Sequence, residues 1–162
     1  MKKTLLVIGA LLALVPAALA APPDPSPSPA QLCRQQQASM SAADFAALYP
    51  GSKPKSAFAR CLARQTQQVS QNADNAAKAC KAERASLGET AFADKWGQNR
   101  NDRNAFGKCV SATARGLTVE QQQATLNAAK KCKNMRASNR AAFETAYGTK
   151  RNAFGKCVAA ND

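Results

Sequence analysis

The sequence predicts an all-α protein of three tandem, disulfide-stapled helical units that form a small bundle or a short solenoid. The heptapeptide Asn-Ala-Phe-Gly-Lys-Cys-Val occurs at 104–110 and again at 152–158, and such self-similarity marks a repeat architecture. The chain has six cysteines, an even number that suits a disulfide framework in an exported protein. Glutamine, alanine, lysine and arginine dominate the repeats, and runs of strand-forming residues are absent.

Residues 1–20 have the three parts of a secretory signal peptide. Lys2 and Lys3 supply the positive charge, 5–15 form an apolar stretch too short to span a bilayer, and Ala18 and Ala20 frame a small-residue cleavage site. We expect cleavage near Ala20 and a secreted protein, located in the medium or in the periplasm or cell envelope. The alternative is a signal anchor that is never cut. We expect no stable membrane insertion after cleavage, because no later apolar run is long enough.

A proline-rich spacer at 21–30 follows the signal peptide and contains five prolines. We expect it to be disordered, with a length of about 30 Å where it is extended. The helical repeat domain then covers 31–162. Its first unit lies at 31–70, its second unit at 71–116 and its third unit at 117–162.

The three units carry the same landmarks in the same order. A cysteine is followed by a basic residue, then by a phenylalanine, by a tyrosine or tryptophan four residues later, by a glycine, and by a second phenylalanine three residues before the closing cysteine. The aromatic pairs are Phe45 with Tyr49, Phe92 with Trp96 and Phe143 with Tyr147. Aromatic residues at i and i+4 share one face of a helix, and a following glycine is a typical stop. Each unit is therefore expected to be a helix, a short aromatic helix and a second helix.

Local signals predict where these helices begin and end. Ser56, Asn104 and Asn152 precede the closing turn of each unit and are good N-caps. The residues 118–121, Thr-Val-Glu-Gln, form a capping box that predicts the start of a long helix through Cys132. We expect breaks at Gly88, at Gly116 and at 97–101.

The spacing of the cysteines favours pairing inside each unit. The ordered part begins just before the first cysteine and ends five residues after the last one. We therefore expect Cys33–Cys61, Cys80–Cys109 and Cys132–Cys157. The alternative joins neighbouring units through Cys61–Cys80 and Cys109–Cys132, and must then pair the distant Cys33 with Cys157; the pattern itself does not decide between them.

The chain has few large apolar residues to bury. After residue 20 there are six leucines, four valines, six phenylalanines and no isoleucine, 16 of 142 residues, which is low for a globular core. Three disulfide loops would each contribute about 3–4 kcal/mol in the chain-entropy account. This is comparable to the net stability of a small domain, so we expect folding to require the disulfides.

The composition argues against an enzyme. The chain has no histidine, and it lacks a CxxC pair, a phosphate-binding glycine loop and a serine-nucleophile motif. If all six cysteines are paired, no thiol is left as a nucleophile. We therefore assign no catalytic residue, metal or cofactor.

Basic charge recurs with the units. The formal net charge is +13, or +11 without Lys2 and Lys3, and such a protein can concentrate at polyanions. Candidate polyanion-binding residues precede the cap position or the closing cysteine of each unit: Lys55, Arg60, Arg103, Lys108, Arg151 and Lys156. Further basic residues follow the first cysteines: Arg34, Lys81, Lys133, Arg84 and Arg136. A cationic stripe would suit nucleic acid, an acidic glycan or a wall polymer.

Two other interpretations of the charge stay open. The protein is alternatively a structural or protein-interaction module whose basic charge serves only solubility. Disruption of anionic membranes is a third interpretation, but the alanine- and glutamine-rich helices offer a thin apolar face.

The residues of the heptapeptide have individual structural roles. Asparagine would cap, phenylalanine would fill the core, and valine would pack one turn beyond it. Glycine would keep one side small so that another helix can approach; the first unit has Ala59 there. Only the lysine has no structural need for its identity.

The landmarks resemble repeats in small exported bacterial proteins without an assigned function. The resemblance covers roughly 31–160, and it rests on the Asn-Ala-Phe-Gly-Lys-Cys closing motif, the Cys-Lys-Ala-Glu-Arg opening and the Ala-Phe and Trp-Gly residues between them. It implies secretion and a shared repeat fold, and it brings no activity, ligand or catalytic residue.

Overall fold

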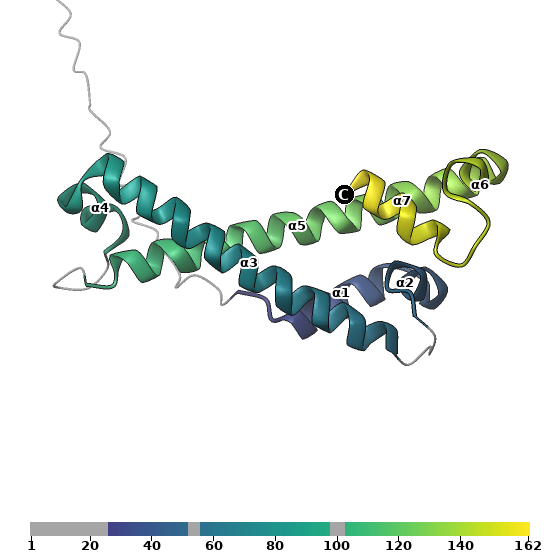
Figure 1. Cartoon of the computed structure of the whole chain (residues 1–162), viewed down its shortest axis with the longest axis horizontal. Helices are drawn as coiled ribbons and strands as arrows, with labels where there is room; N and C mark the ends of the chain where they lie inside the picture. The colour runs from purple at the N-terminus through teal and green to yellow at the C-terminus, as the bar shows by residue number, and fades with distance from the viewer. Residues whose placement is uncertain (1–25, 52–55, 98–102) are drawn as a thin grey trace, which may run out of the picture.

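The computed structural model describes residues 26–51, 56–97 and 103–162, which form seven helices and no strand (Figure 1). The predicted all-α class is confirmed for these residues. The predicted signal peptide, residues 21–25 of the spacer and the candidate Lys55 lie outside them. The helices are α1 (Pro29–Ser39), α2 (Ala42–Leu48), α3 (Ser56–Leu87), α4 (Glu89–Trp96), α5 (Ala105–Ser138), α6 (Arg140–Tyr147) and α7 (Ala153–Asn161).

Helix α1 begins inside the stretch predicted as spacer. Ser28 is its N-cap: the Gln31 amide donates to the Ser28 hydroxyl at 3.3 Å, and the Ser28 amide donates to Gln31 Oε1 at 2.7 Å. Pro29 occupies the first helical position, where its missing N–H costs nothing. This reciprocal cap extends the ordered domain by two residues into 21–30.

Two long helices form the frame of the molecule. α3 and α5 run in opposite directions and cross near their middles (Figure 1), and theirs is the most extensive helix–helix contact. At the crossing, the Asn72 amide donates to the Thr118 hydroxyl at 3.1 Å. The α3–α5 pair therefore carries the chain from the first unit to the second and back to the third.

The predicted helix break between the second and third units was wrong. Gly116 and Thr118 lie inside α5, which is continuous from Ala105 to Ser138. Thr118 does not cap a helix; its hydroxyl donates back to the Ala114 carbonyl at 2.8 Å and accepts from Asn72. One exposed glycine costs a helix only about 1 kcal/mol, which a 34-residue helix tolerates. Both boundaries drawn between units, after 70 and after 116, thus fall within long helices. The predicted break at Gly88 is present between α3 and α4.

The three disulfides pair the cysteines within each unit, as predicted. They are Cys33–Cys61, Cys80–Cys109 and Cys132–Cys157, with Cα–Cα distances of 5.9–6.0 Å. Each joins two helices, so the staples link α1 to α3, α3 to α5 and α5 to α7 in succession. All six sulfurs belong to residues at most 1% exposed. The disulfides are therefore part of the core as well as cross-links.

The apolar core is divided between the two ends of the long helices. The larger cluster combines residues of the first and third units around Cys33–Cys61 and Cys132–Cys157. The smaller cluster, in the second unit, has four buried members in the part of the chain that the structure describes: Cys80, Phe92, Ala105 and Cys109. The fold-back of α5 on α3 therefore pairs the first unit with the third and leaves the second unit at the opposite end (Figure 1).

Polar side chains are buried beside the larger cluster, to which Tyr49 belongs. Gln36 Nε2 donates to Gln122 Oε1 at 2.7 Å, Gln122 Nε2 donates to the Leu32 carbonyl at 3.1 Å, and the Tyr49 hydroxyl donates to Gln36 Oε1. Burial raises the pKa of Tyr49, so its hydroxyl stays protonated as a donor. Such a satisfied network favours one register of α1 against α5, because a slipped register would leave buried polar atoms unpaired.

The structure confirms some of the roles predicted for the residues of the repeated heptapeptide and contradicts others. Asn104 and Asn152 stand at N-cap positions, but neither side chain bonds to a helical amide. The predicted side-chain caps were therefore wrong. Both residues have φ near −90° and ψ near 0°, a conformation in which the side chain does not reach the helical amides. At Gly155 another helix approaches closely, as predicted, because a Cβ there would lie 2.4 Å from the Ala47 carbonyl oxygen of α2. At Gly107 this is not so, since no described atom would lie within 4 Å of its Cβ.

Candidate anion-binding cleft

A cleft of about 1260 Å³ opens where the first and third units meet. Its walls are α2 and the chain after it on one side, and the C-terminal end of α5, α6, the 148–152 connection and the start of α7 on the other. The α2–α7 contact holds these walls together. The cleft therefore exists only because the fold-back brings the two units side by side.

The 148–152 connection presents two basic residues on one wall. α6 ends when the Gly148 amide donates to the Glu144 carbonyl at 2.7 Å. Gly148 has φ of 89°, a left-handed conformation that favours glycine. A turn then closes as the Ala153 amide donates to the Lys150 carbonyl at 2.8 Å. Lys150 and Arg151 are both exposed on this short, hydrogen-bonded connection.

An ion pair across the cleft fixes α2 to α5. Arg136 donates to both carboxylate oxygens of Asp44, at 2.7 and 3.0 Å. Burial would raise the pKa of Asp44, but hydrogen bonds with Arg136 and Ser41 and the charges of Arg136 and Lys133 lower it overall. The Arg136 guanidinium also lies 5.2 Å from the centre of the Phe154 ring, within the range of a cation–π contact. Arg136 thus connects α2, α5 and α7.

The predicted Arg60 supports the other wall. Its Nε and Nη2 donate to the Tyr49 carbonyl at 3.0 and 2.7 Å, at the end of α2. A Cβ at Gly51 would lie 2.1 Å from this guanidinium, so only glycine lets Arg60 approach so closely. The side chain is half-buried, and its charge is added to the cleft.

The cleft has a clear excess of positive charge. Its two carboxylates, Asp44 and Glu144, are each ion-paired, with Arg136 at 2.7 Å and Arg140 at 2.6 Å. Its basic residues are Arg60, Lys133, Arg136, Arg140, Lys150 and Arg151. Among the described residues, six cations against two carboxylates leave an excess of four positive charges. Field lines are focused in a concave site, so this excess makes the cleft attractive to anions.

One polar atom in the cleft wall has no partner. Asn152 Oδ1 is buried without a hydrogen bond in the structure, at the N-cap position of α7. The adjacent N-terminus of α7 carries partial positive charge from unpaired amides. The wall at Asn152 therefore offers an acceptor beside a positive helix end.

The other predicted cations are placed differently. Lys156 is exposed on α7 but does not line the cleft, whereas Arg60 and Arg151 do. Arg103 is exposed and Lys108 is half-buried at the start of α5, at the opposite end of the molecule (Figure 1). Among the described candidates, the structure therefore brings together one from the first unit and one from the third.

Two cleft residues were not among the basic residues that the repeat pattern indicated. Arg140 has no counterpart in the repeat, but Glu144 follows it at i+4, a spacing that signals a helical ion pair. Lys150 is the residue directly before the predicted Arg151. Neither signal could show that these residues face α2, because that contact spans about 100 positions of the chain.

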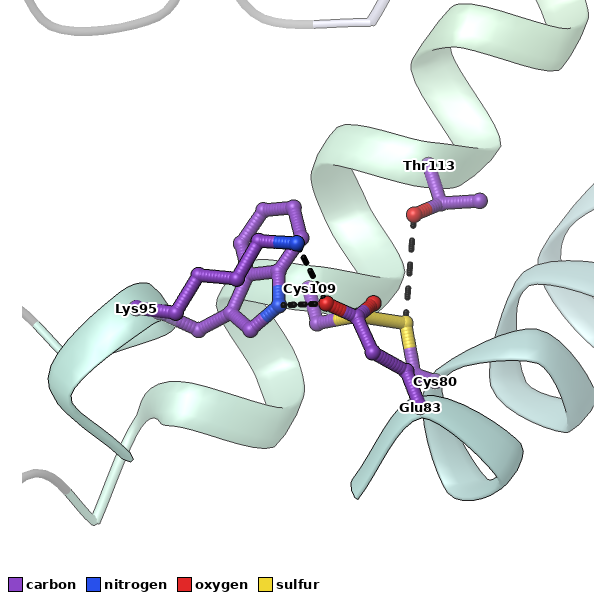
Figure 2. Close-up of polar contacts among 6 residues, drawn as sticks. Cys80, Glu83, Lys95, Cys109 and Thr113 are labelled. Atoms are coloured by element: carbon purple, nitrogen blue, oxygen red, sulfur yellow. Dashed lines mark hydrogen bonds and ion pairs between the residues drawn. A yellow bond between two sulfur atoms is a disulfide. The ribbon is translucent and has the colours of Figure 1, made fainter. Parts of the chain in front are cut away.

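The end of the molecule formed by the second unit has a separate polar cluster. Lys95 Nζ and Trp96 Nε1 both donate to Glu83 Oε1, at 2.6 and 3.1 Å (Figure 2). These hydrogen bonds lower the pKa of Glu83. The Thr113 hydroxyl lies 3.8 Å from Cys80 Sγ beside the disulfide (Figure 2). This cluster anchors α4 to α3 and positions the tryptophan.

The described residues include no group of three or more cysteine or acidic residues that could hold a metal ion. Within the same residues, no helix combines the length and the apolar character needed to cross a membrane. The chain matches no protein-family model, no curated protein and no solved structure.

Proposed function

We propose that the protein is an exported, non-enzymatic repeat protein that binds a polyanion at the cell envelope or in the medium. The observation that carries this proposal is the cleft with six cations and two ion-paired carboxylates. The three disulfides fit an oxidising compartment. The common order of landmarks supports a common origin of the three units as copies of one repeat.

Three cations in the cleft are best placed to contact a ligand. Lys133, Lys150 and Arg151 are exposed, and no ion pair to an acidic residue is formed by any of them among the described residues. Arg136 and Arg140 neutralise the two carboxylates, so that these do not repel an anion. A polymer lying in the cleft would exchange bound counterions for these side chains, which is favourable at low salt and weaker at high salt.

A binding panel across salt concentrations tests this function. DNA, a heparin-like glycan, a teichoic-type polymer and anionic liposomes would each be titrated against the mature protein. Each phosphate contact contributes about 0.7–0.9 to the slope of log K against log salt, so three contacts predict a slope of about −2 to −3. If no member of the panel shows salt-sensitive binding near physiological ionic strength, the basic charge serves solubility and the proposal is wrong.

Charge-matched variants locate the binding. Lys150→Ala with Arg151→Ala removes two cleft cations, and Lys78→Ala with Lys81→Ala removes two exposed cations of α3 in the second unit. The first variant should bind at least tenfold more weakly, with a slope smaller by about 1.5. The control should change affinity less than twofold. Equal losses in both would indicate that only net charge matters and that the cleft is not the site.

A further inference from the structure

The two identical heptapeptides have different surroundings. At 152–158, Phe154 and Val158 are 3% and 1% exposed, and the backbone of α2 crosses directly over Gly155. At 104–110, Phe106 and Val110 are only half-buried, and Gly107 is exposed with no described atom within 4 Å of a Cβ position. The same seven residues are thus covered by a helix in the third unit and uncovered in the second.

The covered copy shows which helix the motif accepts. α2 has the sequence Ala-Ala-Asp-Phe-Ala-Ala-Leu. Its Ala47 carbonyl and Leu48 Cα would lie 2.4 and 3.3 Å from a Cβ on Gly155, so glycine is needed on α7 where the backbone of α2 crosses it. Asp44 of the same helix pairs with Arg136, four residues after the first cysteine of the third unit.

The second unit also has a residue equivalent to Arg136, in addition to its copy of the heptapeptide. Arg84 lies four residues after Cys80, as Arg136 does after Cys132. Its guanidinium pairs with Glu89 at 2.6 Å, and the two side chains are 45% and 74% exposed. An exposed pair of this kind is worth little, so Arg84 can exchange Glu89 for an acidic residue of an incoming helix.

A second copy of the chain cannot supply that helix without losing the contact of α2 with its own α7. Each chain has two copies of the heptapeptide and one α2, which already covers Gly155. The equivalent short helices have Asp94 and Lys95 in α4, and Thr145 and Ala146 in α6, where α2 buries Ala47 and Leu48. Neither α4 nor α6 therefore reproduces the surface of α2, and donation of α2 to another molecule would uncover its own α7.

We propose that the uncovered heptapeptide face of the second unit, formed by Phe106, Gly107, Val110 and Arg84, is a docking site for another protein. The partner presents a short alanine-rich helix with an acidic residue in its first turn, as α2 does. The contact inside this chain is the template for the interface, and the basic Arg84 complements the acidic residue. This docking site is independent of the polyanion-binding cleft.

The single tryptophan provides a direct test. Trp96 packs against the same cluster as Phe106 and Val110, so its fluorescence reports on this face. The probe is a helix-constrained peptide with the sequence of residues 41–49, titrated into the full mature protein. A saturable change in Trp96 emission is expected, with at least tenfold weaker binding of a peptide that carries Asp44→Lys.

Two glycine variants in α5 locate the contact. Gly107→Leu fills the position where the helix would cross, and Gly116→Leu changes the other exposed glycine of α5; neither Cβ has a described neighbour within 4 Å, so both variants should fold. Gly107→Leu should weaken peptide binding at least tenfold, while Gly116→Leu should not. Absence of saturable binding, equal affinity of both variants, or self-association of the protein abolished by Gly107→Leu would each overturn the proposal.

Discussion

The Asp44–Arg136 ion pair predicts that the protein loses different amounts of stability when one or the other of its two residues is replaced by alanine. The Asp44 side chain is 5% exposed, whereas that of Arg136 is 39% exposed. Asp44→Ala leaves a guanidinium that water can solvate, so the loss of stability is at the lower end for hydrogen bonds to a charged group, about 1.5 kcal/mol. Arg136→Ala leaves a buried carboxylate without a partner. We expect the free energy of unfolding to fall by about 3 kcal/mol, the lower end of the cost of breaking a buried ion pair.

The pH dependence separates this explanation from simple loss of packing. In the native protein the pKa of Asp44 is lowered, so its contribution to stability is present above pH 3.8, its ordinary value, and is lost as the pH falls through the lowered pKa. In Arg136→Ala, burial without the partner should raise the pKa of Asp44. Protonation then removes the penalty, and the difference from the native protein should shrink to about 1 kcal/mol near pH 3.

Denaturant unfolding followed by circular dichroism, at pH 7 and at pH 3, measures both effects. Arg136→Ala should be less stable than Asp44→Ala at pH 7, and the two should converge at pH 3. If the two variants lose equal stability at pH 7, or if the loss in Arg136→Ala is independent of pH, the ion pair does not hold α2 on the third unit as we describe.

Three further predictions concern the frame of the molecule. Gly155→Ala should lower stability by about 1–3 kcal/mol because its Cβ would overlap a carbonyl of α2, whereas Gly116→Ala, with no described neighbour, should raise it by about 1 kcal/mol; thermal unfolding that ranks them the other way would refute the packing of α7 on α2. Replacement of Cys80 and Cys109 by alanine should cost about 3–4 kcal/mol and change tryptophan fluorescence first, because the cluster around this disulfide has four buried members among the described residues; simultaneous loss of both ends would contradict the division of the core. Gly148→Ala should cost about 1–2 kcal/mol through its positive φ, and an unchanged unfolding midpoint would count against the left-handed conformation at the end of α6.

Local structure could be predicted from the sequence where short-range signals decide it. The aromatic pairs at i, i+4 placed Phe45 with Tyr49 and Phe143 with Tyr147, and both pairs have ring centroids 5.1 Å apart. The spacing favoured the pairing of each cysteine within its unit without deciding it against pairing between neighbouring units, and the structure confirms it. The break at Gly88 was predicted from its glycine, the same signal that failed at Gly116.

The continuity of the long helices was harder to predict. Thr118 begins a sequence that matches a capping box, yet in α5 its hydroxyl satisfies the Ala114 carbonyl and Asn72 of α3. A tertiary contact thus outweighed a local signal. The stretch between Cys61 and Cys80 contains neither glycine nor proline, and this absence was the available sign that α3 does not break between units.

The cleft itself could not be predicted, because it depends on the direction in which the units fold. Recurring cations suggested one stripe along successive units. The crossing of α3 and α5 instead brings Arg60 of the first unit and Arg151 of the third to one cleft, and places Lys108 at the other end. The partners that fix this arrangement, such as Gln36 and Gln122, are 86 residues apart, beyond the range of any local pattern.

Protection of lysines from chemical acetylation tests the binding cleft most directly. The protein without residues 1–20 would be treated with the reagent with and without the polyanion that binds best in the salt-dependent panel, and the modification of each lysine would be quantified by mass spectrometry. We predict protection of Lys133 and Lys150, which line the cleft, and unchanged modification of Lys78 and Lys81, which are also exposed but lie on α3. Uniform protection of all four lysines, or protection of Lys78 and Lys81 alone, would contradict the assignment of the cleft.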